Sequence, residues 1–250
     1  RSMEDMILKA NGTYDGGIVT VVARGGDVNF LESFVQTNGG GGVGGTTLIS
    51  GSNVTNIRST EIDATGLTQG GTIKIGNDGV DQIIPYSHYS YIDNQSSLNV
   101  SQNDFSLLSS SGGYIETSGH TLNLLASINV GRGGVWLIDP YNVTIDQSST
   151  SGSSFNASGS SYTYNPSQDS SILASSIVAA LNQGISVTIT SGSTGGNGGK
   201  TGNITINAPI IATINKNASL TFNAANQIQL NANITTYGTL TDRKSTRLNS

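Results

Sequence analysis

Two histidines, His88 and His120, are the side chains best suited to bind a metal or move a proton near neutral pH. The chain has no cysteine, and the two histidines do not show the paired spacing of a zinc site. His120 follows Thr-Ser-Gly, a turn sequence that predicts a solvent-facing position. We therefore expect no metal site.

His88 belongs to an aromatic cluster, Pro-Tyr-Ser-His-Tyr-Ser-Tyr, at residues 85–91. Tyr86, Tyr89 and Tyr91 could form a flat platform on which a sugar ring stacks. They could also form an amphipathic excursion that packs against the protein, with each hydroxyl near a polar partner. We favour packing and keep the carbohydrate platform as the alternative.

Carboxylates could support polysaccharide cleavage, which needs acidic groups gathered on one face, with Arg or Lys nearby for a lyase. The chain offers two candidate pairs, Asp78 with Asp81 and Asp139 with Asp146. Most acidic residues are scattered among turn sequences, where Asp bonds to nearby backbone. We interpret both pairs as turn residues, with Asp139 before a proline at a corner. We expect no catalytic residue and no enzymatic activity.

Two glycine-rich segments resemble ligand-binding loops. GNDGVD (76–81) is similar to a calcium-binding turn, but the glycine-rich nonapeptide does not recur. Residues 195–203 contain Gly-Gly-Lys-Thr, but Thr194 stands where a phosphate-binding loop needs glycine, and no βαβ unit surrounds it. We interpret both segments as turns and expect no cofactor.

The composition limits the classes of protein to which the chain can belong. Apolar residues make up 35% of the 250 residues and charged residues only 11%, while glycine is abundant. Such a chain suits a thin core repeated many times, because each layer buries only its inward side chains. A formal net charge of −5 argues against nucleic acid as a partner. No apolar run reaches the roughly 20 residues that a membrane-spanning helix needs.

The elements that must position these side chains are short strands separated by Gly, Asn and Asp. ITINAPI (204–210) is repeated as IQLNANI (228–234), 24 residues later. A Gly-Gly-x-β opening recurs at 16–23, 70–76 and 112–119. The predicted strands are Ile18–Ala23, Thr46–Ile49, Thr72–Ile75, Tyr114–Thr117, Val135–Ile138, Val143–Ile145, Val187–Thr190, Ile204–Ile206, Leu220–Phe222 and Ile228–Leu230.

Repeats of this kind predict an all-β fold, a right-handed parallel β-helix or solenoid. At ~22 residues per coil, the chain would form about ten or eleven coils stacked at the strand spacing of a sheet. Alternation points one set of side chains inward: Ile204, Ile206, Leu220, Phe222, Ile228 and Leu230. The residues between them, Thr205, Thr221 and Gln229, are expected to face solvent.

One segment has helical rather than alternating spacing. Residues 170–184, SSILASSIVAALNQG, place apolar residues on one helical face. Asp169 or Ser170 is the predicted N-cap, and Gly184 suits the position after the last turn. We expect one short α-helix flanking the β-helix. Residues 147–168, rich in Ser, Gly, Asn and Tyr, are predicted to be a long surface loop.

The last nine residues, DRKSTRLNS (242–250), do not fit the rest of the chain. They hold three of its eleven Lys and Arg residues and lose the β alternation. A widely used sequencing-adapter oligonucleotide encodes this peptide. We interpret 242–250 as a non-native tail, residues 1–241 as the β-helix, and the chain as an internal fragment of something longer.

Residues 112–234 resemble the filamentous-haemagglutinin-type adhesins, large exoproteins of Gram-negative bacteria exported by two-partner secretion. The resemblance rests on GGYIETSGH (112–120), GGVWLIDPYNVTI (133–145), ALNQGISVTI (180–189), GNITINAPI (202–210) and ASLTFNAANQIQLNANI (218–234). Residues 1–111 show only general β-repeats, and the family's N-terminal secretion domain has no counterpart in the chain.

The resemblance implies a secreted or surface-exposed adhesive β-helix that binds a receptor or glycan on host or bacterial cells. It also implies an outer-membrane transporter as the partner during export, and it supplies no catalytic residue. The stalk of a contact-dependent toxin is one alternative function. A polysaccharide-degrading β-helix is the other.

Overall fold

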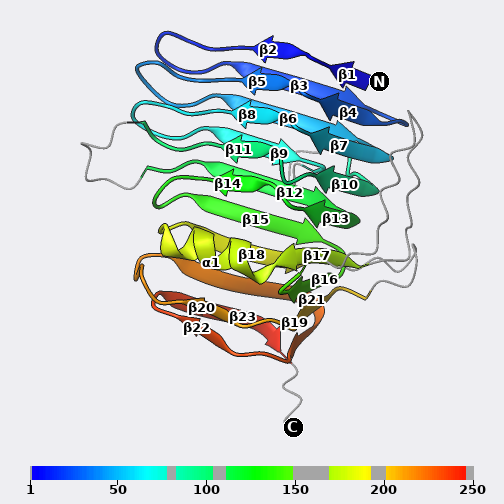
Figure 1. Cartoon of the computed structure of the whole chain (residues 1–250), viewed down its shortest axis with the longest axis vertical. Helices are drawn as coiled ribbons and strands as arrows, with labels where there is room; N and C mark the ends of the chain where they lie inside the picture. Colours follow the sequence, from blue (N-terminus) through cyan, green and yellow to red (C-terminus); the bar gives the residue numbers. More distant parts are fainter. Residues whose placement is uncertain (1, 78–82, 104–110, 149–168, 193–200, 246–250) are drawn as a thin grey trace.

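The computed structural model describes residues 2–77, 83–103, 111–148, 169–192 and 201–245, and it forms a parallel β-helix. The chain winds in stacked coils from the N-terminus at one end to the C-terminus at the other (Figure 1). Every strand pairing in the described part is parallel, and the strands form three lengthwise faces, here called A, B and C. The predicted all-β solenoid fold is confirmed.

The strands of face A are, in order, β3 (Ile18–Ala23), β6 (Thr46–Gly51), β9 (Thr72–Ile75), β12 (Tyr114–Gly119), β15 (Val135–Pro140), β18 (Ser186–Ser191), β21 (Ser219–Leu230) and β23 (Thr239–Ser245). The first five strands of face A, β3, β6, β9, β12 and β15, each follow a pair of glycines. All of the strands predicted on this face are present.

Face B meets face A through β21, which turns the corner and pairs with both β18 and β19. In spatial order its other strands are β1 (Ser2–Glu4), β4 (Val28–Leu31), β7 (Val54–Arg58), β10 (Tyr89–Ile92), β13 (Thr121–Leu124), β17 (Ser170–Leu173), β16 (Val143–Asp146) and β19 (Asn203–Ile206). β17 lies nearer the N-terminal end than β16, although it comes later in the chain.

Face C is made of three-residue strands and is interrupted once. Its strands are β2 (Ile7–Lys9), β5 (Phe34–Gln36), β8 (Glu61–Asp63), β11 (Ser97–Asn99) and β14 (Ser127–Asn129), followed after the interruption by β20 (Ile210–Ala212) and β22 (Ile234–Thr236). The predicted strands include none of these. β5, β8 and β11 each bury only their middle side chain, so no alternation of apolar residues marks them.

The core consists of inward-facing columns, one side chain per coil. On face A, Ile73, Ile115 and Trp136 occupy successive positions of one column, and all three are fully buried. The indole N–H of Trp136 donates to Thr117 Oγ1 at 3.1 Å, so the largest core side chain has its polar group satisfied. Each coil thus contributes one thin apolar layer to the core, and the coils on either side cover it.

Most coils are longer than predicted. Ile18 pairs with Thr46, Thr72 with Tyr114 and Val135 with Ser186, so successive coils differ widely in length. The prediction of ~22 residues per coil and of ten or eleven coils is therefore wrong. Strand pairing fixes only the stacked segments, so coils of different lengths can share the same columns.

The repeat near the C-terminus is confirmed in register. Ile204 pairs with Ile228 on face B, and Ile210 pairs with Ile234 on face C, both at the predicted offset. Ile206 and Ile228 are buried as expected, but Leu230 is 45% exposed. Its column ends there within the described residues, so no further side chain covers it.

The helix α1 (Ala174–Asn182) is shorter than predicted, and its place in the fold is different. Residues 170–173 form β17, the N-cap is Leu173 without a side-chain hydrogen bond, and Asp169 and Ser170 do not cap it. Gly184 has φ of +86°, as a residue ending a helix requires. α1 lies within face C, between β14 and β20, and closes the core in place of a strand (Figure 1).

One corner between faces B and C is held by a ladder of hydroxyl groups. Ser33 Oγ accepts the N–H of Met6 at 3.2 Å, and Thr60 Oγ1 accepts the N–H of Ser33 at 3.3 Å. Ser96 Oγ accepts the N–H of Thr60 at 3.1 Å. Each coil thereby satisfies a backbone donor of the coil before it, which keeps the corner in register.

Candidate functional site

A cluster of rings from four positions lies at the corner where the chain passes from face A to face B. His120 stacks on Tyr141 with ring centroids 4.0 Å apart and on His88 at 4.7 Å, and Tyr86 lies 4.7 Å from His120. The Tyr141 hydroxyl and His120 Nε2 form a 2.6 Å hydrogen bond. We call Tyr86, His88, His120 and Tyr141 the ring cluster.

His120 lies at the turn between β12 and β13, as predicted, but the prediction that it faces solvent is wrong, because the next coil brings Tyr141 against it and leaves it half-buried. Burial, assisted by the nearby His88, lowers the pKa of His120 to about 4, so its ring is neutral at pH 7. The packing interpretation of residues 85–91 is confirmed for Tyr89, which is buried. Tyr86 packs into the ring cluster rather than standing alone as a platform.

Beside the ring cluster lie two carboxyl groups, Glu116 on β12 and Asp139 on β15. Ser118 Oγ donates to Glu116 Oε1 at 3.0 Å, and the Tyr114 hydroxyl donates to Oε2 at 3.3 Å. Thr190 donates to the carboxylate of Asp139, and the Tyr86 hydroxyl donates to the Asp139 main-chain oxygen at 2.8 Å. We call Glu116 and Asp139 the carboxyl pair.

Burial raises both acid pKa values. The pKa of Glu116 rises to about 7, chiefly by burial and in part by the charge of Asp139, against the hydrogen bond from Ser118 and the charge of Lys74. Burial also raises the pKa of Asp139, and hydrogen bonds from Thr190 and Asn77 oppose that rise. Glu116 is only 1% exposed, so its carboxyl lies below the surface, out of direct contact with solvent.

The carboxyl pair differs from both predicted pairs. Asp78 and Asp81 lie outside the described residues, as does most of the calcium-like turn at 76–81. The interpretation of Asp139 as a turn residue is wrong, because it lies within β15; Asp146 is the last residue of β16, and its carboxylate accepts the N–H of Gln147 at 2.7 Å. The acidic neighbour of Asp139 is Glu116. The sequence contains a signal that Glu116 and Asp139 are neighbours. When the paired glycines at 112–113 and 133–134 are aligned, Ser118 falls beside Asp139, and Glu116 stands two residues before Ser118.

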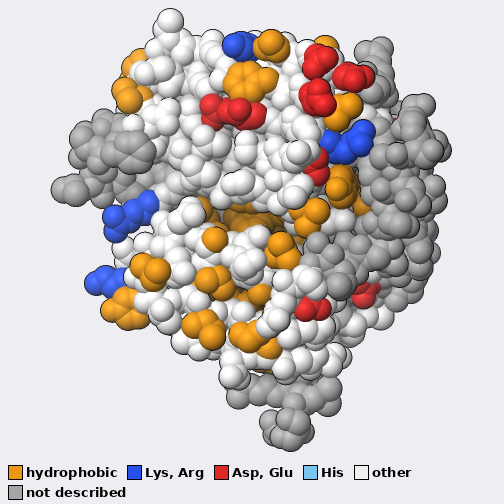
Figure 2. All heavy atoms as spheres, viewed as in Figure 1, with side chains coloured by type: hydrophobic (Ala, Val, Ile, Leu, Met, Phe, Trp, Pro, Cys, Tyr) orange, Lys and Arg blue, Asp and Glu red, His pale blue; other side chains and the backbone are white. Residues whose placement is uncertain are grey.

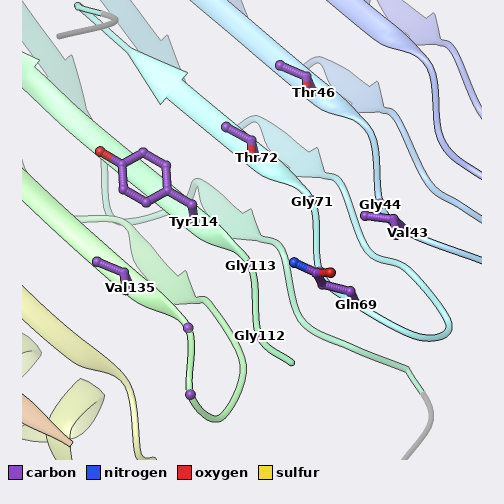
Figure 3. A pocket seen from close by; sticks show the side chains of 13 residues that line it. Val43, Gly44, Thr46, Gln69, Gly71, Thr72, Gly112, Gly113, Tyr114 and Val135 are labelled. Carbon is purple, nitrogen blue, oxygen red and sulfur yellow. The ribbon is translucent and has the colours of Figure 1, made fainter. Parts of the chain in front are cut away.

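A second surface feature, which the sequence reasoning missed, is a groove of about 360 Å³ along face A (Figure 3). Thr46, Thr72, Tyr114 and Val135 stand in one row along it, one per coil, with Gln69 on the opposite side (Figure 3). None of the described residues that line this groove is charged. It offers hydroxyl, amide and aromatic groups to a ligand, so it suits an uncharged, polar partner.

The paired glycines form the floor of this groove. A Cβ added at Gly71 would lie under 3.0 Å from the backbone oxygens of Gly45 and Ala64. The N–H of Gly71 donates to the carbonyl of Ala64 at 2.8 Å, and the N–H of Gly45 donates to that of Thr37 at 2.6 Å. Glycine is needed here because two turns of backbone meet at the corner without room for a side chain.

The visible surface is sparsely charged, with acidic side chains gathered over the N-terminal coils (Figure 2). Among the described residues, no group of three or more His, Cys, Asp or Glu side chains is arranged to hold a metal ion. Within the same residues, no helix is long and apolar enough to cross a bilayer. Most of the Gly-Lys-Thr segment at 195–203 lies outside the described residues.

Comparison with protein-family models gave no match, and comparison with curated protein sequences gave none.

Proposed function

We propose that the chain is a structural and adhesive segment of a large secreted exoprotein, displayed at or released from a Gram-negative cell surface. The observation that carries the proposal is the groove, whose described lining is uncharged and which runs along stacked coils and carries a hydroxyl side chain at three successive coils, Thr46, Thr72 and Tyr114. A ligand lying along it makes many weak contacts, which is how an extended surface gains affinity without a deep pocket. The resemblance of residues 112–234 to haemagglutinin-type adhesins supports the same function.

The partner in this proposal is a receptor or glycan on a host or bacterial cell, and an outer-membrane transporter carries the protein during export. The buried carboxyl pair is assigned a structural role. Glu116 is held between Tyr114 and Ser118 and is not open to a polymer. We therefore propose no polysaccharide cleavage for this chain.

Binding to intact cells and to an array of neutral oligosaccharides tests the proposal. Thr72→Lys places a long charged side chain in the groove, whereas Thr221→Lys makes the same change on an outward position of β21, away from it. We expect Thr72→Lys to weaken binding about tenfold and Thr221→Lys to leave it unchanged. Circular dichroism checks that both variants fold. Equal binding by both variants, or no binding by the unmodified chain, would contradict the proposal.

A further inference from the structure

The row of side chains along the groove advances by one coil at a time. It consists, in order, of Thr46, Thr72, Tyr114 and Val135, which pair directly from each coil to the next. Successive members are therefore about 4.8 Å apart, the spacing of neighbouring strands, and the row is straight. A ligand that contacts every member needs a straight shape and a repeat close to that spacing.

The backbone beneath the row is already paired, which argues against a polypeptide strand as the ligand. The N–H groups of the glycines at 44–45, 70–71 and 112–113 all donate to backbone carbonyls. A peptide that adds to a sheet binds through unpaired main-chain groups, and these glycines offer no free N–H. A strand also rises about 3.3 Å per residue, out of step with the coils. The ligand is therefore recognised by side chains.

Tyr114 gives the groove an aromatic surface. Its hydroxyl donates to Oε2 of the buried Glu116 at 3.3 Å and points away from the paired glycines (Figure 3). This hydrogen bond holds the ring along β12 and leaves its apolar face, rather than its hydroxyl, to contact a ligand. Tyr114 is half-buried, so part of the ring stays open to the groove. An aromatic face beside hydroxyl groups matches a sugar ring, which has an apolar C–H face and polar edges.

The charge of the groove and of the chain selects among sugars. The described lining is uncharged, and the formal net charge of the chain is −5. An anionic glycan needs Arg or Lys side chains to bind its carboxylate or sulfate groups, and the described lining supplies none. A neutral glycan needs only partners for its hydroxyls, which Thr46, Thr72 and Gln69 provide.

We propose that the groove binds a linear neutral glycan of β-1,4-linked hexoses, which lies along the axis of the β-helix with one sugar per coil. A hexose in such a chain is close in length to the spacing of the coils, and the chain is straight. One sugar stacks on Tyr114, and its neighbours reach the hydroxyls of Thr72 and Thr46. The inference rests on the proposed adhesive function and names the class of ligand for the same groove.

Isothermal titration calorimetry of the full chain with glucose oligomers tests the proposal. We expect β-1,4-linked oligomers to bind more tightly with each added sugar up to the tetramer, because four successive coils line the groove. Maltohexaose, whose α-1,4 linkages curve the chain, should bind about tenfold more weakly than cellohexaose. A β-1,4-linked oligoglucuronate of the same length differs in charge and should also bind about tenfold more weakly. Equal affinity for cellohexaose and either comparison hexamer, or an affinity that stops rising at the disaccharide, refutes the proposal.

Substitutions of Tyr114 test the stacking contact. Tyr114→Ala removes the aromatic face and should weaken cellohexaose binding about tenfold or more, whereas Tyr114→Phe keeps that face and should stay within about threefold of the unmodified chain. Tyr237→Ala changes an exposed tyrosine outside the groove and should have no effect. Circular dichroism checks that each variant folds. An equal loss in Tyr114→Phe and Tyr114→Ala would assign binding to the hydroxyl and contradict the stacking contact.

The two proposals fail in different ways. Cell binding that Thr72→Lys weakens, combined with no calorimetric binding of any glucose oligomer, overturns the glycan and leaves the adhesive groove in place. Cellohexaose binding that both Thr72→Lys and Tyr114→Ala weaken, without binding to cells, supports the glycan and overturns the adhesive function.

Discussion

Replacing Glu116 with glutamine tests whether this carboxyl is held in a site that disfavours its charge. Glutamine keeps the shape of the side chain. Its Oε1 can still accept the hydrogen bond from Ser118, and its Nε2–H can donate to the Tyr114 hydroxyl oxygen in place of the bond that Glu116 Oε2 accepts. The pKa of Glu116 rises from 4.5 to about 7 in the folded chain, because burial disfavours the carboxylate. The folded state therefore binds this proton more tightly than the unfolded state does.

The sign and size of the effect follow from that difference. Below pH 4.5 the carboxyl is protonated in both states, and Glu116 imposes no penalty. As the pH rises from 4.5 through about 7, the unfolded state ionises first, and the free energy of unfolding falls. At about 1.4 kcal/mol per pKa unit, the loss from this residue amounts to about 3 kcal/mol above pH 7.

Urea unfolding at pH 4, 6 and 8, followed by fluorescence of Trp136, measures this loss. Trp136 is the only tryptophan, it is buried, and it stacks on Ile115 beside Glu116. We expect Glu116→Gln to match the unmodified chain at pH 4 and to be about 3 kcal/mol more stable at pH 8. Glu61→Gln, an exposed change on face C, should follow the unmodified chain throughout. A Glu116→Gln chain no more stable at pH 8 would refute the reasoning.

Three further substitutions probe the core and the glycine floor. Thr117→Val removes the acceptor of the Trp136 indole N–H, leaves a buried donor unpaired, and should cost about 1–3 kcal/mol in urea unfolding. Gly71→Ala forces a Cβ against backbone atoms and should lower the free energy of unfolding by about 3 kcal/mol or more. Its control is Gly26→Ala, where the nearest atom to the new Cβ would be 3.9 Å away and little effect is expected. Thermal unfolding compares the two variants. Ile177→Ala empties the buried face of α1 and should cost about 2–5 kcal/mol, again by urea unfolding.

Face A could be predicted from the sequence because its strands are long enough to alternate. Ser186–Ser191 shows a buried residue at every second position, and the pattern is visible in the letters alone, because Val187 and Ile189 alternate with Ser and Thr. Strands such as Ser97–Asn99 bury a single side chain, so no periodicity marks them. What does mark them is the repeat: Leu8, Val35 and Ile62 are 27 residues apart and stack directly on face C. That spacing is present in the sequence but is lost where the coils lengthen after Ile62.

The helix shows how local and long-range signals compete. Ile172 and Leu173 fit the helical spacing of the residues that follow, and local propensity gives no reason to stop before them. In the structure they extend β17, because Val143–Asp146 offers a strand edge to which residues 170–173 pair. A strand partner distant in sequence outweighs one more turn of helix, and only the fold supplies that partner.

The candidate site was hidden for a related reason. Glu116 and Asp139 stand near each other because β12 and β15 stack in register, and that register becomes known only when the paired glycines are aligned. His120 looked like a turn residue because nothing in its own segment indicates that Tyr141 arrives beside it. Side chains in a solenoid find most of their neighbours one coil away, so reading along the chain misses them.

At the start of the tail at 242–250, the backbone and the side chains lead to different conclusions about whether the segment belongs to the β-helix. Strand β23 continues to Ser245, across the predicted boundary after residue 241. Any residue except proline offers the N–H and C=O groups that a parallel strand needs, so pairing alone does not mark a sequence as part of the repeat. The side chains are more informative than the pairing. The face A column that contains Ile138, Ile189 and Phe222 continues with Asp242, which is exposed. A charged residue at an inward-facing position is what a foreign segment produces when it is paired onto the last coil, and this keeps the hypothesis of a non-native tail in place.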